Sequence, residues 1–143
     1  LDYPFYGVYY GQLGLPIQPD SISYLEHPMF EECKVYDYQN QREIPMYSMD
    51  LAKGRDAYEM YLSGSLSVIT IENPNATTEK ELVIFRDSFG SSIAPLFAEA
   101  YAKITLLDIR YLNQNLIGNF VIFDNQDVLF LYSTGVLNNR GAF

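Results

Sequence analysis

Several residue types are scarce in this sequence, and each scarcity excludes a class of protein. The chain has one cysteine, Cys33, one histidine, His27, and no tryptophan. A single cysteine cannot build an internal disulfide framework. Because neither cysteines nor histidines form a cluster, no transition-metal site is visible. No glycine-rich phosphate loop follows a strand with a lysine behind it, so we expect neither a metal nor an organic cofactor.

Basic residues are also few, and long apolar runs are missing. Nine Lys and Arg stand against 18 Asp and Glu, which gives a net charge of −9. Such an acidic chain without a basic patch is a poor partner for nucleic acid or an anionic membrane. No apolar run approaches the ~18 residues of a membrane span. The chain opens at Leu1 without a signal segment, which indicates a processed chain or a fragment.

What is present favours one domain, 1–143, with a sizeable core. The chain has 143 residues, of which 48% are hydrophobic. The composition and hydrophobic pattern of the sequence change near residue 64. Residues 1–63 are rich in Tyr, Pro and Gly and predict an irregular β/loop region. Within it we expect short extended pieces at Gly7–Tyr10, Lys34–Tyr38 and Glu43–Met46, and one short helix at Arg55–Leu62.

Residues 64–143 predict a regular β-β-α-β-α-β core. Apolar alternation and short apolar runs indicate strands, and spacings of three and four indicate helices. This order predicts an α/β fold with a small, mainly parallel sheet and flanking helices. The predicted strands are Leu66–Ile71, Glu81–Arg86, Ile104–Ile109 and Asp127–Tyr132, and the predicted helices are Ser92–Tyr101 and a segment from Leu112 to Phe120.

Ligands of parallel sheets bind beyond the carboxyl ends of the strands. The segment after the first parallel strand places Ser88 in a tight strand-to-helix turn. Such a turn exposes the hydroxyl near backbone N–H groups and a helix dipole that can stabilise an oxyanion. From spacing alone, an ordinary turn with capping residues is the favoured interpretation. The candidates at these strand ends are Asp87, Ser88, Gly90, Asp108, Arg110 and Tyr111.

Other candidate residues carry weaker signals. The single histidine, His27, lies in the irregular first part, so the 143 residues do not predict a complete Ser-His-Asp triad. Gly64 precedes a strand and could offer a backbone N–H, although a simple turn is the favoured explanation. The tyrosines Tyr3, Tyr6, Tyr9 and Tyr10 could stack on a sugar, and packing under a loop is the plainer alternative.

Three stretches together resemble the DHHW family. Leu82–Leu96 resembles the family's strand, Arg-Asp-Ser-aromatic-small string and following helix. Ile104–Tyr111 resembles its next strand with an Asp-x-Arg-Tyr ending, and Asp127–Ser133 resembles its last strand. The resemblance implies an SGNH-hydrolase-like fold, similar to the catalytic domains of alginate and other exopolysaccharide O-acetyltransferases. It also implies an exported bacterial protein at the cell surface that acts on an acetylated wall or surface glycan.

The resemblance implies roles for particular residues. Ser88 becomes the nucleophile, and Arg110 and Tyr111 become pocket residues, although a strand-end salt bridge and a packed ring explain them equally well. The family's Asp-His-His-Trp string is missing here, and Gly64-Ser65 stands where a Gly-Asn pair is expected. We therefore expect this chain to be the carboxy-terminal part of a larger domain, whose upstream segment supplies the Asp-His pair.

Two functions from different classes follow. The first is ester hydrolysis or carbohydrate O-acetyl transfer by the intact parent protein, with this chain inactive alone. The second is a non-catalytic surface module that binds glycan or protein through a face with Tyr3, Tyr6, Tyr9 and Tyr111. An open sheet edge would also favour a dimer or a strand swap.

Overall fold

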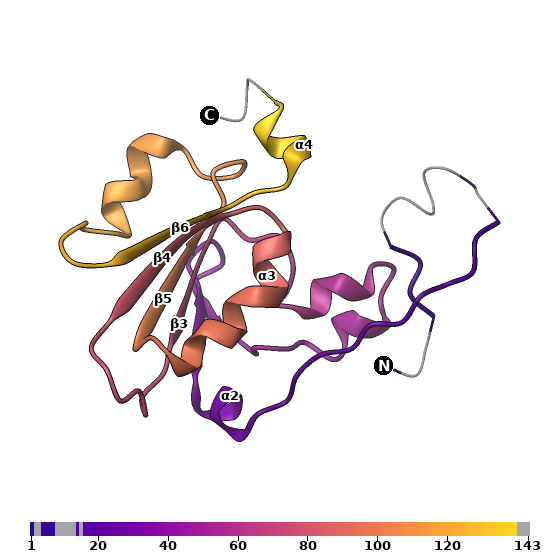
Figure 1. Cartoon of the computed structure of the whole chain (residues 1–143), viewed down its shortest axis with the longest axis horizontal. Coiled ribbons are helices and arrows are strands. Elements are labelled where there is room, and N and C mark those ends of the chain that lie inside the picture. The colour runs from indigo at the N-terminus through magenta and orange to yellow at the C-terminus, as the bar shows by residue number, and fades with distance from the viewer. Residues whose placement is uncertain (2–3, 8–13, 15, 140–143) are drawn as a thin grey trace.

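A computed structural model describes residues 1, 4–7, 14 and 16–139 of the chain. Its centre is a six-stranded sheet with strand order β2-β1-β3-β5-β4-β6 (Figure 1). The strands are β1 (Lys34–Asp37), β2 (Arg42–Ile44), β3 (Val68–Glu72), β4 (Glu81–Arg86), β5 (Lys103–Leu107) and β6 (Asp127–Leu131). The α-helices are α2 (Pro28–Glu32), α3 (Phe89–Ile93) and α4 (Thr134–Leu137). The 3-10 helices are η1 (Leu51–Lys53), η2 (Ala57–Met60), η3 (Ala94–Glu99) and η4 (Gln114–Asn119).

The sheet is mixed, so the expectation of a mainly parallel sheet is wrong. β4 pairs in parallel with β5 and with β6. The other three pairs, β1 with β2, β1 with β3 and β3 with β5, are antiparallel. The cause lies in residues 73–80, which connect β3 to β4 without a helix. A parallel return needs a crossover of about a dozen residues or more, so this short connection reverses the chain. The irregular first part adds its hairpin β1–β2 to the sheet, close to the extended pieces expected at Lys34–Tyr38 and Glu43–Met46.

The predicted helices are present but are shorter and tighter than periodicity indicated. The expected Ser92–Tyr101 helix begins earlier, at Phe89, and becomes the 3-10 helix η3 after Ile93. Pro95 has no backbone N–H and therefore interrupts the α-helical ladder. The segments expected as helices near residues 55–62 and 112–120 are the 3-10 helices η2 and η4. Residues 8–10, where we expected part of an extended piece, lie outside the described residues.

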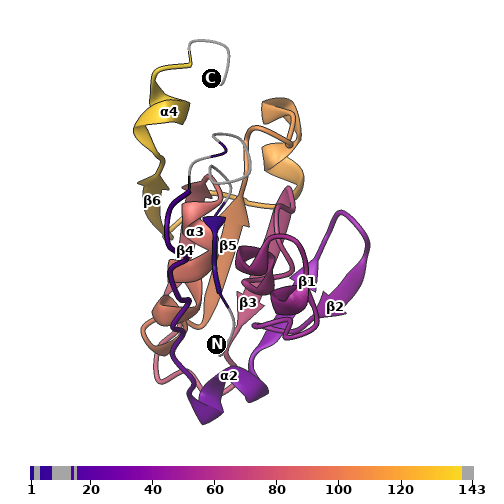
Figure 2. The ribbon, with the colours of Figure 1, turned by 90° about the vertical axis from the view of Figure 1, so that its right-hand side faces the viewer.

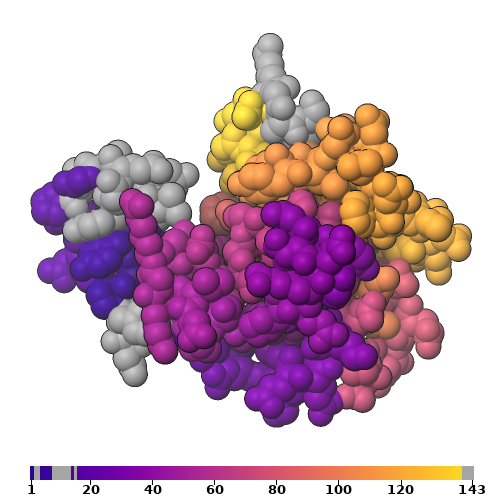
Figure 3. Space-filling view, turned by 180° about the vertical axis from the view of Figure 1, so that it is seen from behind, coloured from indigo at the N-terminus to yellow at the C-terminus, as the bar shows by residue number. Residues whose placement is uncertain are grey.

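Alternating side chains of the central strands fill a core on each face of the sheet. On β4, Leu82 and Ile84 join the cluster that includes Ala94 and Ala98 of η3. Val83 points the other way, into the cluster that η4 covers. The views in Figures 1 and 2 show α3 on one face of the sheet. In Figure 3 the purple hairpin lies beside the orange segment of η4, where the rings of Tyr38 and Phe120 meet edge to face at 5.5 Å.

The two edges of the sheet differ in their protection. The edge strand β2 has three residues and exposes Arg42 and Glu43. The edge strand β6 has five residues and exposes the apolar Val128 and Phe130 at 45% and 68%. Charged, short edges discourage pairing with other chains, and long apolar edges invite it. The edge at β6 is therefore the one that fits the expected dimer, which stays a prediction.

Candidate functional site

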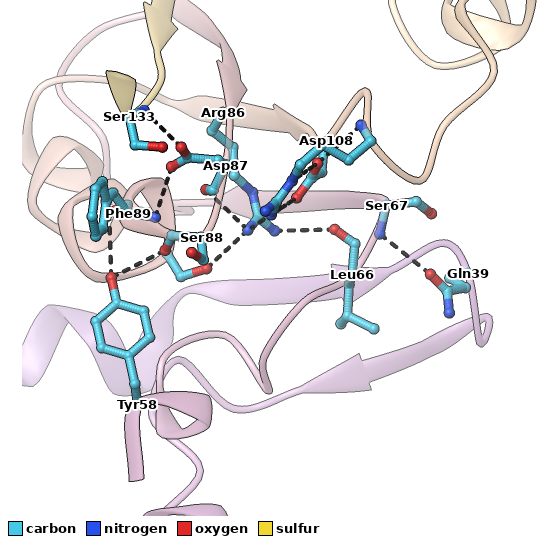
Figure 4. Close-up of polar contacts among 12 residues, drawn as sticks. Gln39, Tyr58, Leu66, Ser67, Arg86, Asp87, Ser88, Phe89, Asp108 and Ser133 are labelled. Atoms are coloured by element: carbon cyan, nitrogen blue, oxygen red, sulfur yellow. Dashed lines mark hydrogen bonds and ion pairs between the residues drawn. The ribbon is translucent and has the colours of Figure 1, made fainter. Parts of the chain in front are cut away.

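The predicted site residues meet at the carboxyl ends of β5, β4 and β6. Phe85 of β4 pairs with Leu107 of β5 and with Phe130 of β6, so the residues that follow these strands lie at one edge of the sheet. Asp108 follows β5, and Asp87 and Ser88 follow β4. In Figure 4 the Asp87 carboxylate meets Ser133 on one side, and Arg86 reaches toward Asp108 on the other. The parallel part of the sheet thus assembles the candidates as the sequence indicated.

Ser88 is the residue at the bend between β4 and α3. Its backbone is helical, with φ −60° and ψ −26°, and the residue is partly exposed. The carbonyl of Ser88 accepts hydrogen bonds from the Ser91 N–H at 3.0 Å and from the Tyr58 hydroxyl at 3.0 Å. Within the described part of the chain, neither the N–H nor the hydroxyl of Ser88 has a hydrogen-bond partner. Both groups are therefore free to meet a ligand while the backbone is held.

Asp87 ties the bend to the end of β6. One carboxylate oxygen accepts the Phe89 N–H at 3.0 Å, and the other accepts the Ser133 N–H at 2.7 Å. Burial alone would raise the pKa of Asp87, but the hydrogen bonds from Ser133 and Phe89 and the charge of Arg110 outweigh it and lower the pKa. Asp87 thus stays ionised as a fixed anchor behind Ser88.

A buried ion network lies under the same bend. Arg86 and Asp108 are both fully buried, and the Arg86 guanidinium lies 3.9 Å from the Asp108 carboxylate. Arg86 also donates to the Ser91 hydroxyl at 2.9 Å and to the Leu66 carbonyl at 3.1 Å. Burial lowers the pKa of Arg86, and the charge of Asp108 opposes that change. Arg86 therefore connects β4, α3 and the segment before β3 through one side chain.

Arg110 closes this network at the surface. Its guanidinium grips Asp108 with two hydrogen bonds, of 2.9 Å from Nε and 2.6 Å from Nη2. These bonds raise the pKa of Arg110. The same guanidinium lies 5.2 Å from the centre of the Tyr111 ring, which is 58% exposed. Arg110 is thus engaged in the strand-end salt bridge that the sequence left as one of two explanations, and Tyr111 stands open at its side.

The two candidate glycines have different settings. Gly90 packs against Arg86, because a Cβ built on Gly90 would lie 2.6 Å from the Arg86 Cβ. The Gly90 N–H already donates to the Asp87 carbonyl at 3.1 Å, which leaves the Ser88 N–H as the open donor at this bend. Gly64 has φ +91° and ends a turn in which Leu62 and Ser63 also have positive φ. This left-handed run is costly for non-glycine residues and is held by packing around it.

Two tyrosines of the site were missed by sequence reasoning. The Tyr58 hydroxyl lies 2.9 Å from the Ser92 hydroxyl as well as 3.0 Å from the Ser88 carbonyl. Burial of Tyr132, together with the charges of Asp108 and Asp87, raises its pKa to about 12 despite the opposing charge of Arg110. Tyr58 comes from η2, some 30 residues before the bend, and no local pattern signals that contact.

His27 lies at the opposite end of the sheet from Ser88. His27 caps α2, and β1 begins shortly after that helix ends. Lys34, the first residue of β1, is aligned across β3 and β5 with Glu81, the first residue of β4. His27 therefore lies near the start of β4, whereas Ser88 follows its end. Figure 1 shows α2 far from the start of α3. Since His27 is the single histidine of the sequence, this chain brings no imidazole to Ser88. Among the described residues, no group of three or more His, Cys, Asp and Glu side chains is placed to hold a metal ion.

The α/β fold of this chain is similar to that of several solved structures. The chain is similar to a structure of Bacillus cereus PatB1 with a sulfonyl adduct, with a TM-score of 0.67 and 23% identity over 98% of this chain and 48% of that one. It is similar to another PatB1 structure, with a TM-score of 0.57 and 25% identity over 80% and 39% of the two chains. A DHHW family protein from Eubacterium siraeum gives a TM-score of 0.52 and 22% identity, over 78% and 38%.

These likenesses confirm the predicted resemblance to the DHHW family at the level of the fold. The chain spans about half the length of PatB1, 48% in the first structure. No model of a protein family matches the sequence, and no curated protein matches it either. In the part of the chain that the structure describes, none of the helices has the length and apolar character that a membrane span needs.

Proposed function

We propose that Ser88 is the nucleophile of a site for ester hydrolysis or O-acetyl transfer on a carbohydrate. The proposal rests on one observation: the Ser88 hydroxyl and N–H are open at the bend after β4, while hydrogen bonds from Tyr58 to the Ser88 carbonyl and from the Phe89 N–H to Asp87 hold that bend. The acid–base partners are an Asp-His pair supplied by polypeptide outside these 143 residues. The chain alone is then expected to be nearly inactive.

The chemistry follows the usual course of acyl transfer. The histidine takes the Ser88 hydroxyl proton as the Ser88 oxygen attacks the acetyl carbonyl carbon. The resulting oxyanion accepts a hydrogen bond from the Ser88 N–H, and further donors would lie outside this chain. The ester bond then breaks, and the departing sugar oxygen takes the proton from the histidine. Water or a second sugar hydroxyl attacks the acetyl-serine and completes hydrolysis or transfer.

The surrounding residues act as positioning residues in this proposal. Asp87 fixes the Phe89 N–H, Tyr58 fixes the Ser88 carbonyl, and Arg86 fixes α3 through Ser91. A nucleophile held to within a few tenths of an ångström reacts faster, since less order has to be created in the transition state. Arg110 and Tyr111 border the open side and are proposed to contact the sugar. The substrate class is an acetylated glycan at the bacterial cell surface, as the family resemblance implies.

Sulfonyl fluoride labelling tests the nucleophile directly. A sulfonyl adduct is described for PatB1, and phenylmethylsulfonyl fluoride sulfonylates activated serine hydroxyls with loss of fluoride. We expect mass spectrometry to find the adduct on Ser88 once imidazole is added as an external base, and to find none in Ser88→Ala. The control is Ser21→Ala, because Ser21 is exposed and lies far from Ser88 in the sequence. Labelling that is unchanged in Ser88→Ala would remove Ser88 from the mechanism.

Hydrolysis of p-nitrophenyl acetate tests the activity in a protein that also carries the Asp-His pair. Loss of an essential nucleophile lowers the rate by about 10³-fold or more. We therefore expect Ser88→Ala to abolish turnover and Ser21→Ala to retain it. An acetylated oligosaccharide offered alongside the simple ester separates the substrate class from the chemistry: acetate release from both supports a carbohydrate esterase.

A non-catalytic binding module is the second candidate, and the position of His27 favours it. The single histidine lies at the far end of the sheet, so the site contains a serine without an imidazole. On this alternative the exposed rings of Tyr6 and Tyr111 contribute to a binding face, and Tyr3 and Tyr9 of the predicted face lie outside the described residues. Glycan binding that survives Ser88→Ala, with no esterase activity in the longer protein, would support this alternative.

A further inference from the structure

A cleft opens at the end of the sheet opposite Ser88. Its volume is about 640 Å³. Residues of α2 and the segment before it form one wall, and residues that follow β2 form the other. We call it the aromatic cleft and define it by Tyr24, Glu26, His27, Phe30, Glu31 and Tyr47. None of these residues takes part in the function proposed for Ser88.

The rings of the aromatic cleft stand at steep angles to one another. The centres of Tyr24 and Tyr47 are 5.2 Å apart with 64° between the ring planes. Phe30 and Tyr47 are 5.8 Å apart at 80°. Rings at these separations pack directly against one another, so a ligand meets only the parts of Tyr24, Phe30 and Tyr47 that line the cleft. An aromatic ring that lines a cleft attracts cations, because its face carries negative potential.

The charged side chains of the aromatic cleft are both acidic. Glu26 and Glu31 line it, and among the residues that the structure describes no Lys or Arg does so. The Tyr24 hydroxyl donates to Glu26 at 2.6 Å, which places that carboxylate at the edge of the rings. Burial, the neighbouring Tyr61 and Tyr24 and the charge of Glu26 raise the pKa of Tyr47 to about 12, so this phenol stays neutral. An anion is repelled here, and a cation meets both carboxylates and rings.

His27 uses its Nδ1 for a contact within the chain. Its Nδ1 accepts the Met29 N–H at 3.2 Å and caps α2, which requires a lone pair on that nitrogen. The lining also includes methionine and proline side chains, namely Met46, Met49, Pro28 and Pro45. These apolar groups suit the carbon stem of a ligand rather than its charged end.

We propose that the aromatic cleft binds an alkylammonium group, with its charge among Tyr24, Tyr47 and the carboxylates of Glu26 and Glu31. The same chemistry is found in a lysine side chain and in a choline headgroup. Cation–π contacts at partly exposed sites are individually modest. We therefore expect binding with a Kd of about 1 mM, strengthened in a natural ligand by contacts beyond the ammonium.

The test uses proton NMR titrations of the 143-residue chain with three small probes. Choline and Nα-acetyl-lysine amide represent the two sources of the ammonium, and 3,3-dimethylbutan-1-ol is the neutral counterpart of choline with the same shape. We expect tyrosine ring signals to shift with at least one cation and binding of the neutral probe to be about tenfold weaker. The cation that binds more tightly identifies the source.

Variants locate the binding site. Glu26→Gln and Glu31→Gln should each weaken cation binding about two- to fivefold, as expected for partly exposed charges. Tyr47→Leu should weaken it about fivefold or more. Glu99→Gln, an exposed carboxylate outside the cleft, and Ser88→Ala should leave it unchanged. If Tyr47→Leu does not fold, the two glutamine variants still decide the matter, because both glutamates are exposed.

Three results would overturn this proposal. The first is equal binding of the neutral probe, which would make the cleft merely apolar. The second is no shift with either cation up to about 20 mM, well above the expected Kd. The third is binding of a neutral oligosaccharide with no binding of choline or lysine. Because Ser88 plays no part, these outcomes do not depend on whether the esterase proposal holds.

Discussion

The two ends of the sheet are built from different interactions. At the carboxyl end of β4, three charged residues are buried almost completely, with exposures of 0% for Arg86, 2% for Asp87 and 0% for Asp108. At the other end, the aromatic cleft buries neutral rings and keeps its carboxylates at the surface. Buried charges are costly unless several partners fix them. The first end is therefore rigid around Ser88, whereas the second end keeps its charges exposed to solvent.

The largest expected effect comes from removing the buried anion. Asp108→Asn leaves the fully buried Arg86 without its carboxylate. Breaking a buried ion pair in this way costs about 3–5 kcal/mol. We expect urea unfolding to show a loss of that size, with the midpoint moving to lower urea at an unchanged slope.

An exposed ion pair provides the control for this prediction. Glu72 lies 3.9 Å from Lys103, and their side chains are 52% and 34% exposed. Glu72→Gln should cost about 0–1 kcal/mol. If Asp108→Asn costs no more than Glu72→Gln, buried charge does not distinguish the carboxyl end of the sheet.

The second prediction concerns the close packing of α3 on Arg86. Gly90→Ala places a methyl group 2.6 Å from the Arg86 Cβ, which backbone and side chain must move to accept. Overpacking of this kind costs about 1–3 kcal/mol. Gly118→Ala is the matched control, since no atom lies within 4 Å of its built Cβ. Thermal unfolding that is equal in the two variants would show that the bend is not tightly packed.

The sequence predicted the strands well, because each buried strand is a short apolar run or an alternating one. It predicted the gathering of Asp87, Ser88, Asp108 and Arg110 from their places after those strands. It could not predict that Arg86, at the end of the run Leu82–Phe85, is fully buried, because a terminal arginine usually marks a surface. The antiparallel direction of β3 and the contact of Tyr58 with Ser88 depend on segments that are distant in the sequence. The aromatic cleft likewise joins Tyr24 to Tyr47 across the hairpin, beyond any local pattern.

The third prediction is a pH dependence at the carboxyl end. Hydrogen bonds lower the pKa of Asp87 below its ordinary value of 3.8, although burial opposes them. A carboxyl group whose pKa is lower in the folded protein than in the unfolded chain stabilises the fold at every pH above the unfolded-chain value. That stabilisation is lost as the pH falls through the pKa of the folded protein. We expect the stability gap between the wild type and Asp87→Asn to be constant above about pH 5 and to shrink below 3.8. A gap that widens toward low pH would contradict the assigned hydrogen bonds.

The smallest expected effect is at the opposite end, at Cys33. Burial, and then the charge of Glu32, raise the pKa of this thiol above its ordinary value of 9.0. Alkylation requires the thiolate, so iodoacetamide at pH 8 should react with Cys33 more slowly than with a free thiol. Glu32→Gln should speed the reaction about two- to fivefold, because a partly exposed charge contributes less than about 1 kcal/mol. Glu99→Gln should leave the rate unchanged. If Glu32→Gln changed the rate by about 100-fold or more, charges at this end would act as strongly as buried ones, and the contrast between the two ends would fail.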